Sequence, residues 1–101
     1  PYTTLFRSGD MNGIERIAAE RQRQIEVEGF GPEHDSGNEN GEMIDAAICY
    51  AMNAEIQDGH HVSIWPWKEE WWKPADPIRD LEKAGALIAA EIDRLLRARA
   101  T

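Results

Sequence analysis

The sequence is poor in cysteine, in basic residues and in long apolar runs. Cys49 is the only cysteine among 101 residues, so the chain forms no internal disulfide and has no Cys-x-x-Cys pair for zinc. Eleven Lys and Arg stand against 19 Asp and Glu, a formal net charge of −8. General nucleic-acid binding and docking on anionic membranes need positive charge, so both are disfavoured. No membrane span or signal peptide is visible, which predicts a cytoplasmic protein.

A strand pattern is also missing, and the chain favours three helices instead. Asn12 and Glu15 have the spacing of a capping box, which predicts a helix start. A second helix is expected from about Asn40 to about Asp58; it is apolar on most sides and should therefore be central. A third begins at Asp76, which precedes a proline at the first helical position. Between the first two helices, glycines and Asn, Asp and Ser residues predict a loop.

The predicted fold is therefore all-α: a small three-helix bundle with one short helical turn. Residues 1–10 are interpreted as a tag remnant or a disordered arm, and residues 11–101 as a single helical domain. The second and third helices carry more apolar surface than a three-helix monomer covers. In the third, a coiled-coil-like seam joins Leu81, Gly85, Ile88, Ile92 and Leu95. We therefore expect a homo-oligomer.

The stretch "WPWKEEWWKP", residues 65–74, holds all four tryptophans. Prolines at both ends predict a short helical turn that stops before Pro74. Indoles in such a segment either complete a thin core or form an exposed binding platform, and we expect two of each kind. Lysines among them would meet a phosphate. The candidate ligand-binding residues are Trp65, Trp67, Lys68, Trp71, Trp72, Lys73, Arg21 and His34.

Carboxylates suggest an alternative chemistry. Glu42 and Asp45 lie three residues apart on the second helix, and Glu20 would face them from the first. Clustered carboxylates between helices can hold Mg²⁺. The motif "EMID", residues 42–45, resembles the E-x-x-D element of MazG-like nucleotide pyrophosphohydrolases, but their E-x-x-E element is missing from the first helix. No set of residues typical of a catalytic triad or a phosphate-binding glycine loop is present.

A second resemblance covers about residues 14–97. It is carried by the phrases "ERQRQI" (20–25), "EGFGPEHD" (28–35), "AAICYA" (46–51), "WPWKEEWWKP" (65–74) and "DLEKAGALIAAEIDR" (80–94). Together these are similar to a family of small uncharacterised proteins of bacteriophages and prophages. That family usually has Trp in place of Phe30 and Thr in place of Gly31. The resemblance implies expression in the cytoplasm of an infected bacterium, where small acidic phage proteins act by binding.

Three functional hypotheses follow. The first is a phage-type accessory protein that acts by binding, either as a counter-defence inhibitor of a host defence protein or by sequestering a nucleotide-like ligand. It is not an enzyme and needs no cofactor. The second is a Mg²⁺-dependent nucleotide pyrophosphohydrolase in which Glu20, Glu42 and Asp45 hold the metal. The third is a structural oligomer without a ligand.

Overall fold

The computed structural model describes residues 11–100, so the expectation for residues 1–10 lies outside the described part. No strand occurs within that range, which confirms the all-helical prediction. None of these helices is long and apolar enough to cross a membrane. The elements are α2 (Gly13–Glu26), α3 (Pro32–Ser36), α4 (Glu42–Ile56), the 3₁₀ helix η2 (Glu69–Trp71) and α5 (Pro77–Ala100).

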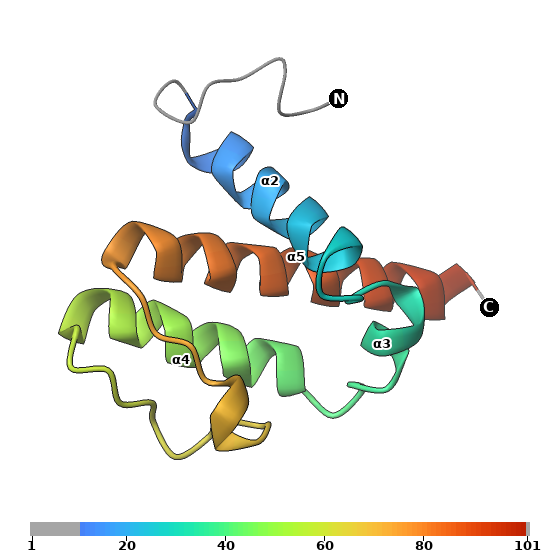
Figure 1. Ribbon diagram of the computed structural model, residues 1–101. Helices are drawn as coiled ribbons and strands as arrows, with labels where there is room; N and C mark the ends of the chain where they lie inside the picture. The colour runs from blue at the N-terminus through green and yellow to red at the C-terminus, as the bar shows by residue number, and fades with distance from the viewer. Residues whose placement is uncertain (1–10, 101) are drawn as a thin grey trace.

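The central element is α5, and α4, α2 and α3 all pack on it. Figure 1 shows α4 and α5 side by side in opposite directions, while α2 crosses the other flank of α5 obliquely. The expectation that the 40–58 helix would be central was wrong. That helix is apolar on most sides, but one of its apolar sides faces outward and does not pack on a third helix.

Local signals set the helix starts. The Asn12 side chain accepts the Glu15 backbone N–H at 3.0 Å, and the Glu15 carboxylate accepts the Asn12 N–H at 2.9 Å, so the predicted capping box is present. Asp76 accepts the Arg79 N–H at 2.9 Å immediately before α5, as an N-cap does. A local signal also ends α4, which stops at Gln57, whose backbone is left-handed with φ +55°. These termini agree with the sequence prediction to within about two residues.

The loop expected between the first two helices contains one short helix, α3. Pro32 occupies its first turn, where a missing N–H costs nothing. Its position depends on Asp35, which is fully buried although it lies in a polar stretch of sequence. A five-residue helix leaves no periodic pattern, so the sequence analysis missed it.

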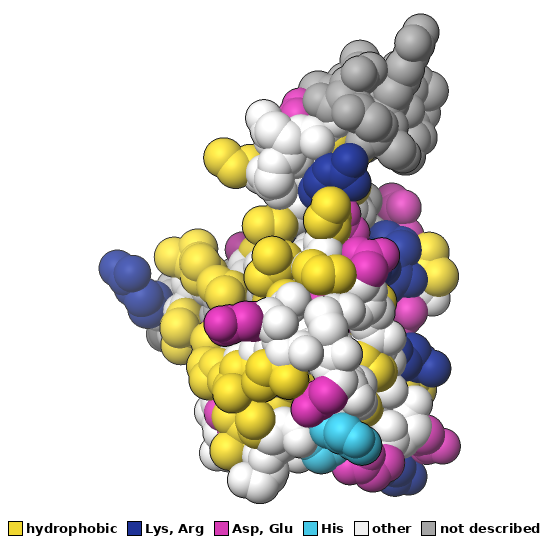
Figure 2. All heavy atoms as spheres, turned by 90° about the vertical axis from the view of Figure 1, so that its left-hand side faces the viewer, with side chains coloured by type: hydrophobic (Ala, Val, Ile, Leu, Met, Phe, Trp, Pro, Cys, Tyr) yellow, Lys and Arg dark blue, Asp and Glu magenta, His cyan; other side chains and the backbone are white. Residues whose placement is uncertain are grey.

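Small side chains fill the core. Five of its nine buried hydrophobic residues are alanines, and the largest contributions come from Met43, Tyr50 and Leu87. Cys49 is also buried, and burial raises the pKa of its thiol. The large aliphatic side chains lie mostly outside this core, and Figure 2 shows hydrophobic side chains gathered along one side of the molecule. Helices with facing alanines approach closely but bury little apolar area each.

The contact between α2 and α5 depends on Gly85. A Cβ atom at this position would lie 2.5 Å from Ile17 Cδ1 and 2.7 Å from Ile17 Cγ1. Gly85 therefore gives α2 room to pack on α5. The sequence analysis placed Gly85 in the apolar seam with Leu81, but it serves the contact with α2 instead.

Candidate functional site

A large cleft of about 830 Å³ lies between α2, α5 and the linker, which we define as residues 57–76. Its size is within the range of small-molecule sites. The lining side chains are of two kinds, aromatic and cationic, with two carboxylates and a few others. They are Glu20, Arg23, Gln24, Glu28, Phe30, His34, Tyr50, Trp65, Pro66, Trp67, Lys68, Trp71, Lys73, Arg79, Lys83 and Leu87.

The charge of this cleft is opposite to that of the chain. All three lysines of the protein line it, and so do two arginines, against two glutamates. The lining therefore carries a formal charge of about +3 in a chain of charge −8. Three of the four tryptophans line the same cleft. Such a combination of cations and flat aromatic walls fits an anion that has a planar ring.

Three indole N–H groups are anchored to the protein. Trp65 donates to the Lys68 carbonyl at 3.1 Å, Trp67 to the Asn38 side chain at 3.0 Å, and Trp72 to the Gly59 carbonyl at 2.9 Å. Their rings also pack on one another: Trp65 meets Trp67 edge-on at 5.5 Å between ring centroids and Trp72 at 5.1 Å. Anchored rings in mutual contact make a rigid wall.

Trp71 differs from the other three tryptophans. It lies in η2, lines the cleft and is 51% exposed. Its indole N–H has no protein partner among the residues that the structure describes. An exposed indole at the edge of a cleft is free to stack on an incoming ring. The expected division into core and platform thus becomes three packed indoles and one exposed indole.

Tyr50 contacts both the tryptophans of this wall and the lysines beside it. Its hydroxyl accepts the Lys73 N–H at 3.2 Å, and its ring packs on Trp72 with centroids 4.8 Å apart. Burial raises the pKa of Tyr50 to about 12, so the hydroxyl stays neutral. The Lys83 ammonium lies 5.2 Å from the Tyr50 ring centroid. This placement resembles a cation–π contact and orients Lys83 toward the cleft.

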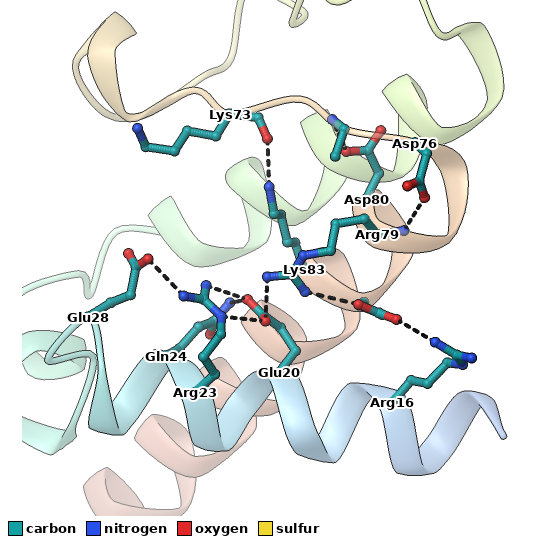
Figure 3. A network of polar contacts seen from close by, with 12 residues as sticks. Arg16, Glu20, Arg23, Gln24, Glu28, Lys73, Asp76, Arg79, Asp80 and Lys83 are labelled. Atoms are coloured by element: carbon teal, nitrogen blue, oxygen red, sulfur yellow. Dashed lines mark hydrogen bonds and ion pairs between the residues drawn. The ribbon is translucent and has the colours of Figure 1, made fainter. Parts of the chain in front are cut away.

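Lys83 donates to the Lys73 carbonyl at 2.6 Å (Figure 3). An ammonium has three N–H donors, so two remain for a ligand. Burial, followed by the positive charge of Arg79, lowers the pKa of Lys83 from its ordinary value. An anion in the cleft would offset both effects and hold Lys83 in its charged form.

Glu20 fixes the two cleft arginines. Its carboxylate is buried and accepts from Arg23 at 2.8 Å, while Arg79 lies 2.7 Å from the same oxygen (Figure 3). Burial alone would raise the pKa of Glu20, but hydrogen bonds from Arg23 and Arg79 outweigh it and the net pKa is lowered. The carboxylate therefore stays ionised and holds both guanidinium groups at the cleft.

Asp80 ties the linker to α5. It is fully buried and accepts from the Asn53 amide at 2.7 Å, the Ala75 N–H at 2.8 Å and the Gln57 amide at 3.1 Å. These donors come from α4 and from both ends of the linker. One carboxylate thus holds together the three segments that position the indoles.

The far end of the cleft is set by α3. Buried Asp35 lies 3.0 Å from the Arg21 guanidinium, which also donates to the Phe30 carbonyl at 3.0 Å. His34 contacts Asp35 at 3.1 Å and stacks on Phe30 with ring centroids 4.3 Å apart. The His34 ring also lies 6.5 Å from the Trp67 ring between centroids, so His34 and Phe30 continue the aromatic wall.

Six of the eight expected ligand residues line the cleft: Trp65, Trp67, Lys68, Trp71, Lys73 and His34. Two do not. Trp72 packs under the wall against Tyr50, and Arg21 is engaged by Asp35. The cleft also includes the cations Arg23, Arg79 and Lys83, which were not among the expected ligand residues. They lie on α2 and α5, and no pattern within one segment shows that these helices meet the linker. Glu20 and Gln24 are buried, although the run of sequence around them is dense in charge.

The carboxylates of the metal hypothesis do not come together. Among residues 11–100, no three His, Cys, Asp or Glu side chains lie close enough to hold a metal ion. Glu20 is bound to Arg23 and Arg79, and Glu42 accepts the Asn40 N–H at 2.7 Å. The expected set of Glu20, Glu42 and Asp45 is therefore not assembled within this chain.

Comparisons with protein-family models, with curated proteins and with solved structures find no match to this chain.

Proposed function

We propose that the protein is a small-molecule binding protein whose cleft holds a nucleotide-like ligand, an anion joined to a planar aromatic ring. One observation carries this proposal: all three lysines and three of the four tryptophans line the same cleft. In an acidic protein, cations concentrated beside indoles favour a ligand that needs both.

The cleft divides the work between two groups of side chains. The exposed Trp71 ring stacks on the base, a contact worth about 1–3 kcal/mol in other proteins. Lys83 and Lys73 face the phosphate with free N–H donors, and each charged hydrogen bond contributes about 1.5–3 kcal/mol. Glu20 keeps Arg23 and Arg79 in place but also neutralises part of their charge, so the lysines dominate the attraction.

Binding without catalysis fits this inventory better than hydrolysis does. The lining offers cations and rings, while the carboxylates that would hold Mg²⁺ are separated or engaged by arginines. A counter-defence role by sequestration is therefore preferred to inhibition of a basic host protein, because the distinctive surface is positive. The setting in phage-infected bacterial cytoplasm and action as a homo-oligomer belong to this proposal, and the sequence patterns support both.

Isothermal titration calorimetry tests the proposal with four probes: a nucleoside monophosphate, a cyclic dinucleotide, the matching nucleoside and inorganic phosphate. We expect at least one nucleotide to bind, and the nucleoside and phosphate to bind at least tenfold more weakly. The tryptophan fluorescence of the protein should be partly quenched on binding because the base stacks on Trp71. Absence of binding by both nucleotides at millimolar concentration would contradict the proposal.

Variants locate the site. Lys83→Gln and Lys73→Gln should each weaken nucleotide binding about tenfold, since each loses a charged hydrogen bond. Arg99→Gln is the matched control: it also removes one positive charge, but from the exposed end of α5, outside the cleft. An equal loss in all three variants would indicate general electrostatic attraction instead of a defined site.

A further inference from the structure

The side of α4 and α5 away from the linker exposes most of the large aliphatic side chains. None of the ten isoleucines is buried, although alanines fill the core. Six residues make up what we call the outer face, and each is between 37% and 52% exposed: Ile44, Ile48, Leu81, Ile88, Ile92 and Leu95. A folded chain rarely leaves so many large side chains in water while burying small ones.

The outer face lies opposite the cleft. Successive residues advance about 100° around an α-helix, so positions nine apart lie roughly 180° from each other. Ile88 is nine residues after Arg79, and Ile92 is nine residues after Lys83. Since Arg79 and Lys83 line the cleft, the two isoleucines point to the reverse side of α5. Whatever covers the outer face therefore leaves the cleft open.

We propose that the outer face binds a second copy of this chain, with the two α5 helices antiparallel across a twofold axis near Ile88. The pattern of α5 is symmetric about that residue: Leu81 and Leu95 both lie seven positions from it. A twofold axis at Ile88 thus sets Leu81 against Leu95 of the partner subunit at both ends. An isologous interface requires this self-complementarity, because each patch meets its own copy.

The charges around the outer face are compatible with a second copy. Two chains of charge −8 repel each other overall, but all six positions of the outer face itself are uncharged. Glu55 is eleven residues after Ile44 and therefore lies on the same side of α4. The end of α4 is beside the start of α5, where Asn53 donates to Asp80. The antiparallel arrangement brings Arg99 of the partner subunit toward the start of α5 and hence toward Glu55. Opposite charges at the rim fix the register of such a pairing.

The exposed apolar area makes up most of what each partner of a stable dimer buries. Six half-exposed aliphatic side chains and their neighbours Ala51 and Leu96 present an apolar area on the order of 600 Å², the upper end of what monomers leave uncovered. A stable interface buries about 800 Å² on each partner. Because alanines make up most of the core, the monomer buries little apolar area. Pairing through the outer face would add the apolar burial that the monomer lacks.

Sedimentation equilibrium of the full chain across a wide concentration range tests the inference. We expect a dimer for the wild type and a monomer for Ile88→Glu, because this change places two carboxylates on the twofold axis. Val27→Glu is the matched control; Val27 is an exposed aliphatic residue at the end of α2, and its variant should stay dimeric. A monomeric wild type, or a dimer that survives Ile88→Glu, would overturn the proposal.

Cross-linking gives a second readout in case Ile88→Glu fails to fold. Under mild oxidation, Ile88→Cys should form an intermolecular disulfide, since the residue on the axis meets its own copy. Val27→Cys should not, and the native Cys49 is buried and should stay reduced in both. Equal cross-linking of the two variants, or none in Ile88→Cys, would place the interface elsewhere. Neither experiment involves a ligand, so a failure here overturns the dimer without bearing on whether the cleft binds a nucleotide.

Discussion

The two sides of α5 are built on opposite principles. Toward the cleft, α5 presents Arg79 and Lys83, next to the buried Asp80 that holds the linker, and each has named polar partners. Toward the outside it presents Ile88 and Ile92, which are about half exposed and have no apolar cover. On the cleft side, the polar groups find their partners within one chain. On the outer side, the apolar side chains stay partly in water.

This difference separates what one chain completes from what it leaves for association. Polar networks inside a fold are costly unless every member is paired, so the cleft side requires a defined geometry. An apolar face is tolerant of geometry but needs cover. We therefore expect substitutions on the cleft side to act on the folded monomer and substitutions on the outer face to act on assembly.

The largest effect is expected at Asp80. Asp80→Ala should lower the free energy of unfolding by about 3–5 kcal/mol, because three donors lose their buried acceptor at once. Urea denaturation measures it. Asp93→Ala is the control: it also lies on α5, but it is exposed and makes a single 3.5 Å ion pair with Arg21, worth less than about 1 kcal/mol. Similar losses in both variants would contradict the role given to Asp80.

The adjacent tryptophans Trp71 and Trp72 should behave differently. Trp72 packs on the core through Tyr50 and is anchored to Gly59, so Trp72→Ala should cost about 2–3 kcal/mol of stability. Trp71→Ala should cost less than about 1 kcal/mol, because half of its surface is already in water. Nucleotide affinity should show the reverse order among variants that remain folded. Thermal denaturation and calorimetry on the same samples make the comparison.

Gly85 marks the border between α2 and the outer face. Gly85→Ala gains about 1 kcal/mol in helix propensity but forces a Cβ against Ile17, which costs about 1–3 kcal/mol, so we expect a net loss of about 1 kcal/mol. In an Ile17→Ala background, the same change should become stabilising because the obstacle is gone. Chemical denaturation of the double-mutant cycle shows whether the sign reverses, and an unchanged sign would mean that Ile17 is not the obstacle.

The smallest effect concerns His61, which contacts the Glu69 carboxylate and stacks on Trp65. Hydrogen bonds to the Val62 carbonyl and to Glu69 raise the pKa of His61 above its ordinary value. Its contribution to stability is therefore complete below the unfolded pKa, about 6.5, and is lost as the pH rises through the higher folded pKa. The melting temperatures of the wild type and His61→Gln should converge above that range. His60→Gln should show no such convergence, because among residues 11–100 His60 meets a carboxylate only through its backbone N–H, which donates to Asp58.

Sequence reasoning succeeded where structure is decided locally. The cap residues Asn12 and Asp76 act within three residues of the helix starts, so their helices were predictable. The tryptophan cluster was predictable as a feature for the same reason. Reasoning failed where distant segments meet: Lys83 reaches the linker only because α5 folds back on it, and Glu20 is buried only because Arg79 crosses over from α5. No periodic pattern in one segment contains that information.

The hydrogen bonds that join the two ends of the linker have a consequence for a chain cleaved within it. Gln57 bridges to the Ala75 carbonyl at 3.1 Å and to Asp80, so the first and last residues of this long connection are joined at its base. A single nick by trypsin after the exposed Lys68 would therefore sever the backbone without releasing either fragment. The two pieces should migrate as one molecule under native conditions and separate only in denaturant, so the protein should tolerate being made as two complementary halves.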